Sequence, residues 1–232
     1  MVRNAGMSNA FKLSPSDLTF LWDECPRCFY LKVAQNFSRP AAPFPKIFSR
    51  IDRLMKDHFS ERSTSELSPD LPPGVIRFSD LRVASDLIWL PGHSQPCYLK
   101  GVADSLIAFN DGSYGIIDFK TSQAHPDHVA FYSRQLHAYA YALEHPAPGA
   151  RGLQPIRRLG LFTVEPVLLE QTPDGRIAYL GEVTWAEIPK DEPGFLAFLE
   201  EVMTVLENSQ PPQGNPECKF CQYREDARKM VY

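Results

Sequence analysis

Two pairs of cysteines near opposite ends of the sequence constrain the fold more than any other feature. Cys25 and Cys28 form one C-x-x-C pair, Cys218 and Cys221 form the other, and 190 positions separate Cys28 from Cys218. Together they supply four thiolates, the ligand set of a tetrahedral zinc ion or of an iron–sulfur cluster. A shared metal would join the two ends of the chain as a small lobe and would remove much entropy from the unfolded chain.

The spacing of the cysteines by itself favours zinc, because paired C-x-x-C motifs are the usual zinc pattern. The alternative is two unrelated pairs of buried thiols. The fifth cysteine, Cys97, lies in a strand-like segment, where we expect it to act as a small hydrophobic residue.

A metal is favoured over disulfides because the sequence predicts a cytoplasmic protein, in which thiols stay reduced. No apolar run approaches the roughly 18 residues that are needed to span a bilayer, so no membrane partner is expected. The first residues, Met1 to Ala10, lack the apolar core of a signal peptide.

The composition is that of a globular protein with one substantial core. The chain has 232 residues, of which 44% are hydrophobic and 22% charged, so we predict a single domain over 1–232. We place its core at about 47–208 and the cysteine lobe at about 13–35 and 209–232. The net charge of −4 excludes a strongly basic protein that coats nucleic acid. It is compatible with an acidic site for a divalent metal.

Hydrophobic periodicity predicts an α/β fold, in which a central mixed β-sheet is flanked by helices. Helices are expected at about 14–33, 47–61, 127–144 and 192–208. Alternating and β-branched runs indicate strands at about 75–78, 81–90, 98–109, 114–121, 156–165 and 177–185. The first helix opens with Ser14 and Pro15, a cap residue followed by proline at the first helical position.

The sharpest local signal is a predicted hairpin that carries two acids and a lysine. Asp118 and Lys120 are two apart in one strand, so their side chains share a face. If Asn110-Asp111-Gly112 forms a three-residue loop, paired residue numbers sum to 222 and Asp104 lies opposite Asp118. A two-residue Asp-Gly loop would instead place Asp104 opposite Phe119.

Such a group of side chains has a specific chemical use. Two carboxylates that close repel each other unless a cation lies between them. Their oxygens suit Mg²⁺ or Mn²⁺, which polarise a phosphodiester and lower the pKa of a bound water. A neighbouring lysine would orient that water or stabilise the phosphorane charge. Asp104, Asp118 and Lys120 therefore predict phosphodiester hydrolysis, the alternative being an exposed hairpin with an Asp/Lys surface pair.

These residues and several flanking motifs resemble the RecB/AddB-type nucleases of the PD-(D/E)xK superfamily, which share their motifs with the CRISPR-associated RecB-like exonucleases. The similarity covers most of the chain, from about 13 to 223. It implies a restriction-endonuclease-like core. The motifs, in chain order, are Leu13-Ser14-Pro15-Ser16, Cys25-Pro26-Arg27-Cys28-Phe29-Tyr30, Gly101-Val102-Ala103-Asp104, Ile117-Asp118-Phe119-Lys120-Thr121-Ser122 and Gln135-x-x-x-Tyr139.

The resemblance also implies a role for each residue of the site. Asp104 and Asp118 would bind the metal, and Lys120 would be the catalytic lysine. Many members have Glu where this chain has Asp118, although RecB-like members often have Asp. Gln135 and Tyr139, four apart on a helix, would lie beside the site and position Lys120 or the DNA backbone. Alternatively, they are a solvated glutamine and a tyrosine at the edge of the core.

A histidine on the preceding helix, His58, is a further candidate metal ligand. Its spacing from Ile51 and Leu54 puts it on the apolar face of the 47–61 helix. A histidine at such a place is usually a core residue, but the resembling family often supplies a metal ligand from this helix.

For the cysteines, the resemblance implies a 4Fe–4S cluster, which many relatives hold with one N-terminal and three C-terminal cysteines. This chain departs from that pattern, because no cysteine stands near Ala227 and Cys28 would supply the fourth thiolate. We therefore expect a 4Fe–4S cluster at Cys25, Cys28, Cys218 and Cys221, with structural Zn²⁺ as the alternative.

The expected function is that of a Mg²⁺- or Mn²⁺-dependent deoxyribonuclease, an exonuclease acting on single strands or duplex ends. The resemblance implies DNA repair, recombination or CRISPR adaptation, with a helicase or CRISPR-integrase partner. A second hypothesis is a non-catalytic DNA-binding or scaffold module of a helicase–nuclease or repair assembly. A third, a zinc-ribbon interaction protein, leaves the two acids and the lysine unexplained.

Overall fold

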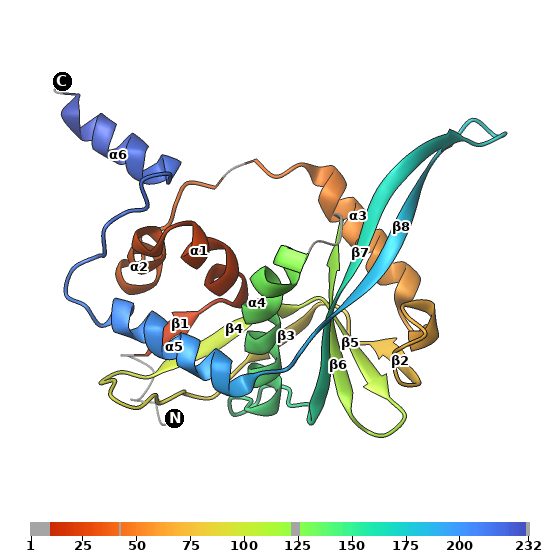
Figure 1. Cartoon of the computed structure of the whole chain (residues 1–232), viewed down its shortest axis with the longest axis horizontal. Coiled ribbons are helices and arrows are strands. Elements are labelled where there is room, and N and C mark those ends of the chain that lie inside the picture. Colours follow the sequence, from red (N-terminus) through yellow and green to blue (C-terminus); the bar gives the residue numbers. More distant parts are fainter. Residues whose placement is uncertain (1–9, 42, 122–125, 231–232) are drawn as a thin grey trace.

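The computed structural model describes residues 10–41, 43–121 and 126–230, and it has the α/β architecture that the sequence predicts (Figure 1). Ser122 and residues 1–9, which entered the sequence analysis, lie outside the described residues. The larger sheet is mixed, because β6 and β7 are parallel and its other neighbours are antiparallel. Its strands, in order, are β2 (Gly74–Arg77), β5 (Ser105–Phe109), β6 (Tyr114–Lys120), β7 (Ile156–Gln171) and β8 (Ile177–Ile188).

A second, smaller sheet lies beside the first. Its strands have the order β1 (Phe11–Leu13), β4 (Cys97–Ala103) and β3 (Leu81–Ala84). Short helical turns occur at Asp17–Leu21 and Thr64–Glu66. The helices are α1 (Trp22–Glu24), α2 (Pro26–Gln35), α3 (Lys46–Phe59), α4 (Pro126–Glu144), α5 (Glu192–Leu206) and α6 (Lys219–Lys229).

Helices α3 and α4 cover opposite faces of the five-stranded sheet, because strand side chains alternate. Ile107 and Ile117, at odd positions, belong to the hydrophobic cluster that contains Met55 of α3. Ile116, at an even position of β6, belongs to the larger cluster that contains Leu136 of α4. The even positions 118 and 120 therefore face α4, at the end of β6.

The segment 98–109, predicted as one strand, is broken at Asp104. On one side β4 pairs in the three-stranded sheet, and on the other β5 pairs in the five-stranded sheet. The backbone oxygen of Asp104 accepts a hydrogen bond of 2.8 Å from the N–H of Asp80. The chain thus changes sheet at Asp104, and this residue lies at the junction of the two sheets.

The predicted helix over 14–33 is also interrupted. Cys25 has extended backbone angles (φ −166°, ψ 103°), and α2 begins at Pro26. The cause is local, because a residue before proline is disfavoured in the helical region and proline suits the first helical position. Cys25 therefore precedes the helix and Cys28 lies within its first turn.

Other differences concern element lengths and weak patterns. The strand expected over 81–90 ends at Ala84, and the hairpin β7–β8 is longer than predicted, so its tip projects from the body of the molecule (Figure 1). Strand β1 and helix α6 were not anticipated. None of the helices within the described residues has the length and hydropathy that a membrane span requires.

Candidate functional site

The β5–β6 hairpin has the register that a three-residue loop predicts. Ser105 pairs with Ile117, so paired numbers sum to 222, and Gly112 in the loop has a left-handed φ of +82°. One position further, Asp104 comes opposite Asp118. The two carboxylates that the sequence singles out are thereby brought together, from the sheet junction and from the end of β6.

Asp118 and Lys120 form a buried ion pair. Lys120 Nζ lies 2.6 Å from Asp118 Oδ2, and only 2% of the Asp118 side chain is exposed. Burial raises the pKa of Asp118 to about 7, with Lys120 opposing the rise and the Asp104 carboxylate adding to it. Burial alone would lower the pKa of Lys120, but the Asp118 carboxylate raises it overall. Lys120 is thus a cation at neutral pH.

Asp104 accepts a hydrogen bond from the backbone of β6, the strand that carries Asp118 and Lys120. Its Oδ2 accepts a hydrogen bond of 3.3 Å from the N–H of Phe119. Phe119 points to the opposite face of β6, where its ring packs against Phe59 of α3 with centroids 5.9 Å apart. The packing of one face therefore fixes the backbone that positions the acids on the other.

Gln135 and Tyr139 of α4 both lie at the site: Gln135 contacts Asp118, and Tyr139 contacts Gln135. Gln135 Nε2 lies 3.4 Å from Asp118 Oδ1 and 3.3 Å from the Tyr139 hydroxyl oxygen. Gln135 Oε1 is buried without a hydrogen-bond partner among the described residues. The ring of Tyr132, one turn earlier in α4, lies 4.5 Å from Lys120 Nζ. Tyr132 is a site residue that the sequence motifs did not identify.

A second lysine, Lys56 of α3, was also missed from the sequence. Its side chain is 9% exposed, and its Nζ lies 3.0 Å from Asp104 Oδ1, 2.8 Å from Asp80 Oδ1 and 3.0 Å from Asp52 Oδ2. These carboxylates hold the pKa of Lys56 well above its usual value although burial opposes this. Apolar periodicity identifies the buried face of a helix by its hydrophobic residues, so it does not reveal a buried lysine. The only hint in the sequence is that Lys56 follows Met55, a residue of that face.

His58 is not brought to the carboxylates, and its expected place on the buried face is corrected. Positions 56 and 58 of a helix are about 200° apart, so the turn that directs Lys56 to Asp104 directs His58 away. His58 is exposed, and its ring lies edge-on to Phe59 with centroids 4.8 Å apart. It lines an apolar groove with Val164 of β7, Val183 of β8 and other residues of α3.

The charges around the site leave room for a divalent cation. When Asp52, Asp80, Asp104 and Asp118 are ionised, two ammonium groups balance two of their four charges. A net charge of −2 remains, and burial already disfavours ionised Asp118. A Mg²⁺ or Mn²⁺ ion would remove this imbalance with the oxygen ligands that it prefers. The acid pair therefore fits a divalent metal.

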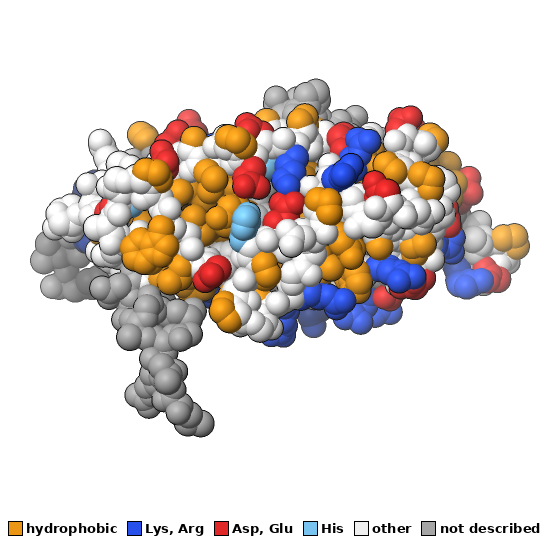
Figure 2. Space-filling model, turned by 90° about the horizontal axis from the view of Figure 1, so that it is seen from below, with side chains coloured by type: hydrophobic (Ala, Val, Ile, Leu, Met, Phe, Trp, Pro, Cys, Tyr) orange, Lys and Arg blue, Asp and Glu red, His pale blue; other side chains and the backbone are white. Residues whose placement is uncertain are grey.

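The site opens into a cleft of about 340 Å³ between α3 and the end of β6. Its lining includes Asp104, Lys120 and Thr121, together with the exposed rings of Phe44 and Phe48. On the face of the molecule seen in Figure 2, acidic, basic and hydrophobic side chains are interspersed. The described residues form no uniformly basic surface on that face.

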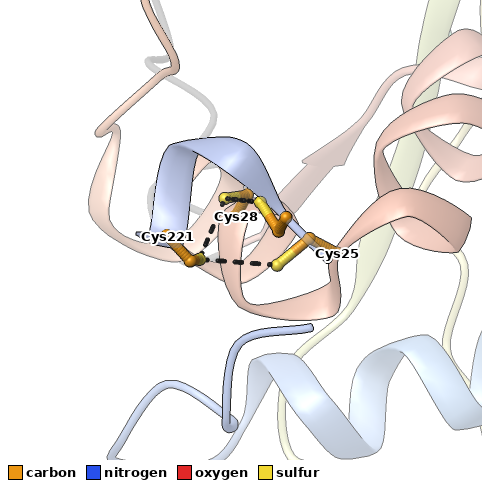
Figure 3. Close-up of side chains that lie close together, drawn as sticks. Cys25, Cys28 and Cys221 are labelled. Atoms are coloured by element: carbon orange, nitrogen blue, oxygen red, sulfur yellow. Dashed lines mark hydrogen bonds between the residues drawn. The ribbon is translucent and has the colours of Figure 1, made fainter. Parts of the chain in front are cut away.

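The four cysteines of the two C-x-x-C pairs come together at a second place. Their Sγ atoms lie within 4.8 Å of one another, and all four side chains are buried (Figure 3). Cys25 and Cys28 come from the start of α2, and Cys218 and Cys221 from the start of α6. The expectation that the two ends of the chain meet is confirmed, and the alternative of two unrelated thiol pairs is wrong. Cys97 lies apart, buried in β4 as expected.

A family model described as the PD-(D/E)XK nuclease superfamily matches residues 46–225. Among solved structures, the chain is similar to the crystal structure of SSO0001, with a TM-score of 0.49 and 18% identity. That match covers 100% of this chain and 90% of the other. A comparison with curated proteins found no match.

Proposed function

We propose a function from one premise: the chain belongs to the PD-(D/E)XK nuclease superfamily, whose members are metal-dependent nucleases. We propose that this protein is a Mg²⁺- or Mn²⁺-dependent deoxyribonuclease that hydrolyses phosphodiester bonds at Asp104, Asp118 and Lys120. The observation that carries the proposal is the hairpin register, which sets two acids opposite each other with the lysine 2.6 Å from one of them.

Asp104, Asp118 and Lys120 have different roles in the proposed reaction. Asp104 and Asp118 would hold a divalent ion, which would supply polarisation of the phosphodiester and a lower pKa for the attacking water. Burial raises the pKa of Asp118 to about 7, so this carboxyl would release its proton on becoming a metal ligand. Lys120 is a fixed cation that stabilises the negative charge that develops on the phosphorus oxygens. Its orientation is set by Asp118 and by the ring of Tyr132.

Gln135 and Lys56 are positioning residues. Gln135 Nε2 holds one oxygen of Asp118, leaving the other directed at Lys120. Lys56 holds Asp104 together with the acids of α3 and of the β2–β3 connection, and thereby reduces repulsion within the cluster. Because Lys56 already neutralises part of the acidic charge, we propose that the site takes one divalent ion per chain.

The cleft beside the acids supports a single strand or a frayed duplex end as the substrate. Phe44 and Phe48 are 69% and 42% exposed, and bases stack on exposed aromatic rings irrespective of sequence. A strand with its bases over these rings would bring its backbone towards Asp104 and Lys120, which line the same cleft. We propose an exonuclease on this basis, and DNA repair, recombination or CRISPR adaptation as its setting, with a helicase or integrase as partner.

The test is cleavage of end-labelled single- and double-stranded DNA with Mg²⁺, with Mn²⁺ and with chelator. We expect metal-dependent cleavage that starts from ends and is lost with the chelator. Lys120→Ala should reduce the rate about 10²- to 10³-fold, as for the loss of one transition-state donor. The matched control is Lys229→Ala, an exposed lysine of α6. Equal rates for Lys120→Ala and the control would leave only a DNA-binding or scaffold role for this site.

A further inference from the structure

We propose that the four cysteines hold a single tetrahedral zinc ion and not the 4Fe–4S cluster that the family resemblance implies. The observation is the separation of the sulfur atoms. Cys25 Sγ is 3.7 Å from Cys221 Sγ, and Cys28 Sγ is 3.8 Å from Cys218 Sγ and 3.7 Å from Cys221 Sγ (Figure 3). No pair of the four Sγ atoms is more than 4.8 Å apart.

These separations match the size of one zinc–thiolate tetrahedron. With Zn–S bonds of about 2.3 Å, the edges of a regular tetrahedron are about 3.8 Å long. Even if every edge were 4.8 Å, the sulfurs would lie only about 2.9 Å from their common centre. A single ion therefore binds here with small adjustments of the side chains.

A 4Fe–4S cluster does not fit the same space. Each of its thiolates binds a different iron atom, so the thiolates are spread around a body of four irons and four sulfides. Sulfur atoms that lie within 4.8 Å of one another leave no room for four irons and four sulfides between them. The neighbouring backbone also restricts how far these sulfur atoms could move apart. At Gly214, a Cβ would lie 3.0 Å from Cys221 Sγ, so the loop before α6 packs directly against the four cysteines.

Two arginines lie beside the thiolates and offset their negative charge. Four thiolates with one Zn²⁺ carry a net charge of −2. Arg39 Nη2 lies 3.2 Å from Cys218 Sγ, and Arg224 Nη2 lies 3.9 Å from Cys28 Sγ. Two guanidinium groups thus offset part of the excess charge and donate to the sulfurs, as outer partners of metal ligands do. Arg39 is held in turn by Glu24, at 2.6 Å.

Metal content decides between the two groups without reference to nuclease activity. The full chain is produced in iron-supplemented medium and purified without oxygen, so that a labile cluster would survive. We expect a colourless protein with one zinc per chain and no acid-labile sulfide. A brown protein with about four irons and four sulfides per chain would overturn the proposal, and so would a protein without stoichiometric metal.

Variants and a metal exchange keep the test independent of folding. Cys218→Ser should lose most of the zinc, whereas Cys97→Ser, a buried cysteine outside the cluster, should keep one zinc per chain. If Cys218→Ser does not fold, Co²⁺ is exchanged into the wild-type protein. Intense visible bands of tetrahedral cobalt–thiolate would support the proposal, and weak octahedral bands would contradict it.

Discussion

Asp118→Asn should abolish cleavage and yet stabilise the metal-free protein. The carboxyl of Asp118 is buried, and its pKa rises from a usual value of 3.8 to about 7. A carboxyl with a higher pKa in the folded protein than in the unfolded chain destabilises the fold as the pH rises. The free energy of unfolding begins to fall near pH 4, where the unfolded chain releases the proton, and stops falling above about pH 7, where the folded protein has released it too. Asparagine has the same shape and never carries this charge.

The size of the gain follows from the shift. A rise from 3.8 to about 7 corresponds to about 4 kcal/mol at alkaline pH, which is an upper limit. The variant also leaves Lys120 without its ion-pair partner, which offsets part of this. We therefore expect Asp118→Asn to be about 1–3 kcal/mol more stable than wild type at pH 8. The difference should be about 2 kcal/mol smaller at pH 5.

Urea unfolding of both proteins at pH 5 and pH 8, without added divalent metal, measures these differences. The cysteine cluster is the same in both, so its own pH dependence cancels. Asp57→Asn, which removes an exposed carboxylate of α3, is the control and should change little at either pH. Mg²⁺ should stabilise only the wild type at pH 8. A variant that is less stable than wild type at pH 8, or a difference independent of pH, would refute the reasoning.

Three further substitutions test the surroundings of the site. Lys56→Met should destabilise the fold by about 1–3 kcal/mol in thermal unfolding, because it leaves Asp104 without its cation. Asp52 and Asp80 are exposed enough to be hydrated, so they should add little to this cost. Gly160→Ala should cost about 1–3 kcal/mol in urea unfolding, since its Cβ would lie 2.2 Å from the Trp185 ring, and unchanged stability would contradict that packing. His58→Ala should cleave DNA at the wild-type rate, and a loss like that of Lys120→Ala would restore His58 as a metal ligand.

The sequence predicted the parts of the site that depend on short-range geometry. The loop with Gly112 sets the register, and the register sets Asp104 opposite Asp118, so a count of residues sufficed. The PD-(D/E)XK superfamily and the α/β class were likewise predicted and confirmed, whereas the RecB/AddB-like subfamily remains a prediction. The division into a core and a cysteine lobe remains a prediction.

What was missed depends on contacts between distant segments. The break at Asp104 arises because β4 and β5 pair in different sheets, which the alternating pattern of one segment does not reveal. Lys56 is buried by three acids from elsewhere, against the rule that lysines face solvent. Helix α6 is polar nearly throughout, with Cys221 as its buried residue, so hydrophobic periodicity gave no signal. By contrast, the break at Cys25 was readable from Pro26.

The binding of Mn²⁺ tests most directly whether Asp104 and Asp118 share a divalent cation. It is measured from the electron paramagnetic resonance signal of the free ion, which decreases as the ion binds. Wild-type protein with its cysteine site filled should bind one Mn²⁺ per chain at pH 8, and Asp104→Asn and Asp118→Asn should each abolish that binding. Equal Mn²⁺ binding by wild type and both variants would contradict a metal site at the paired carboxylates.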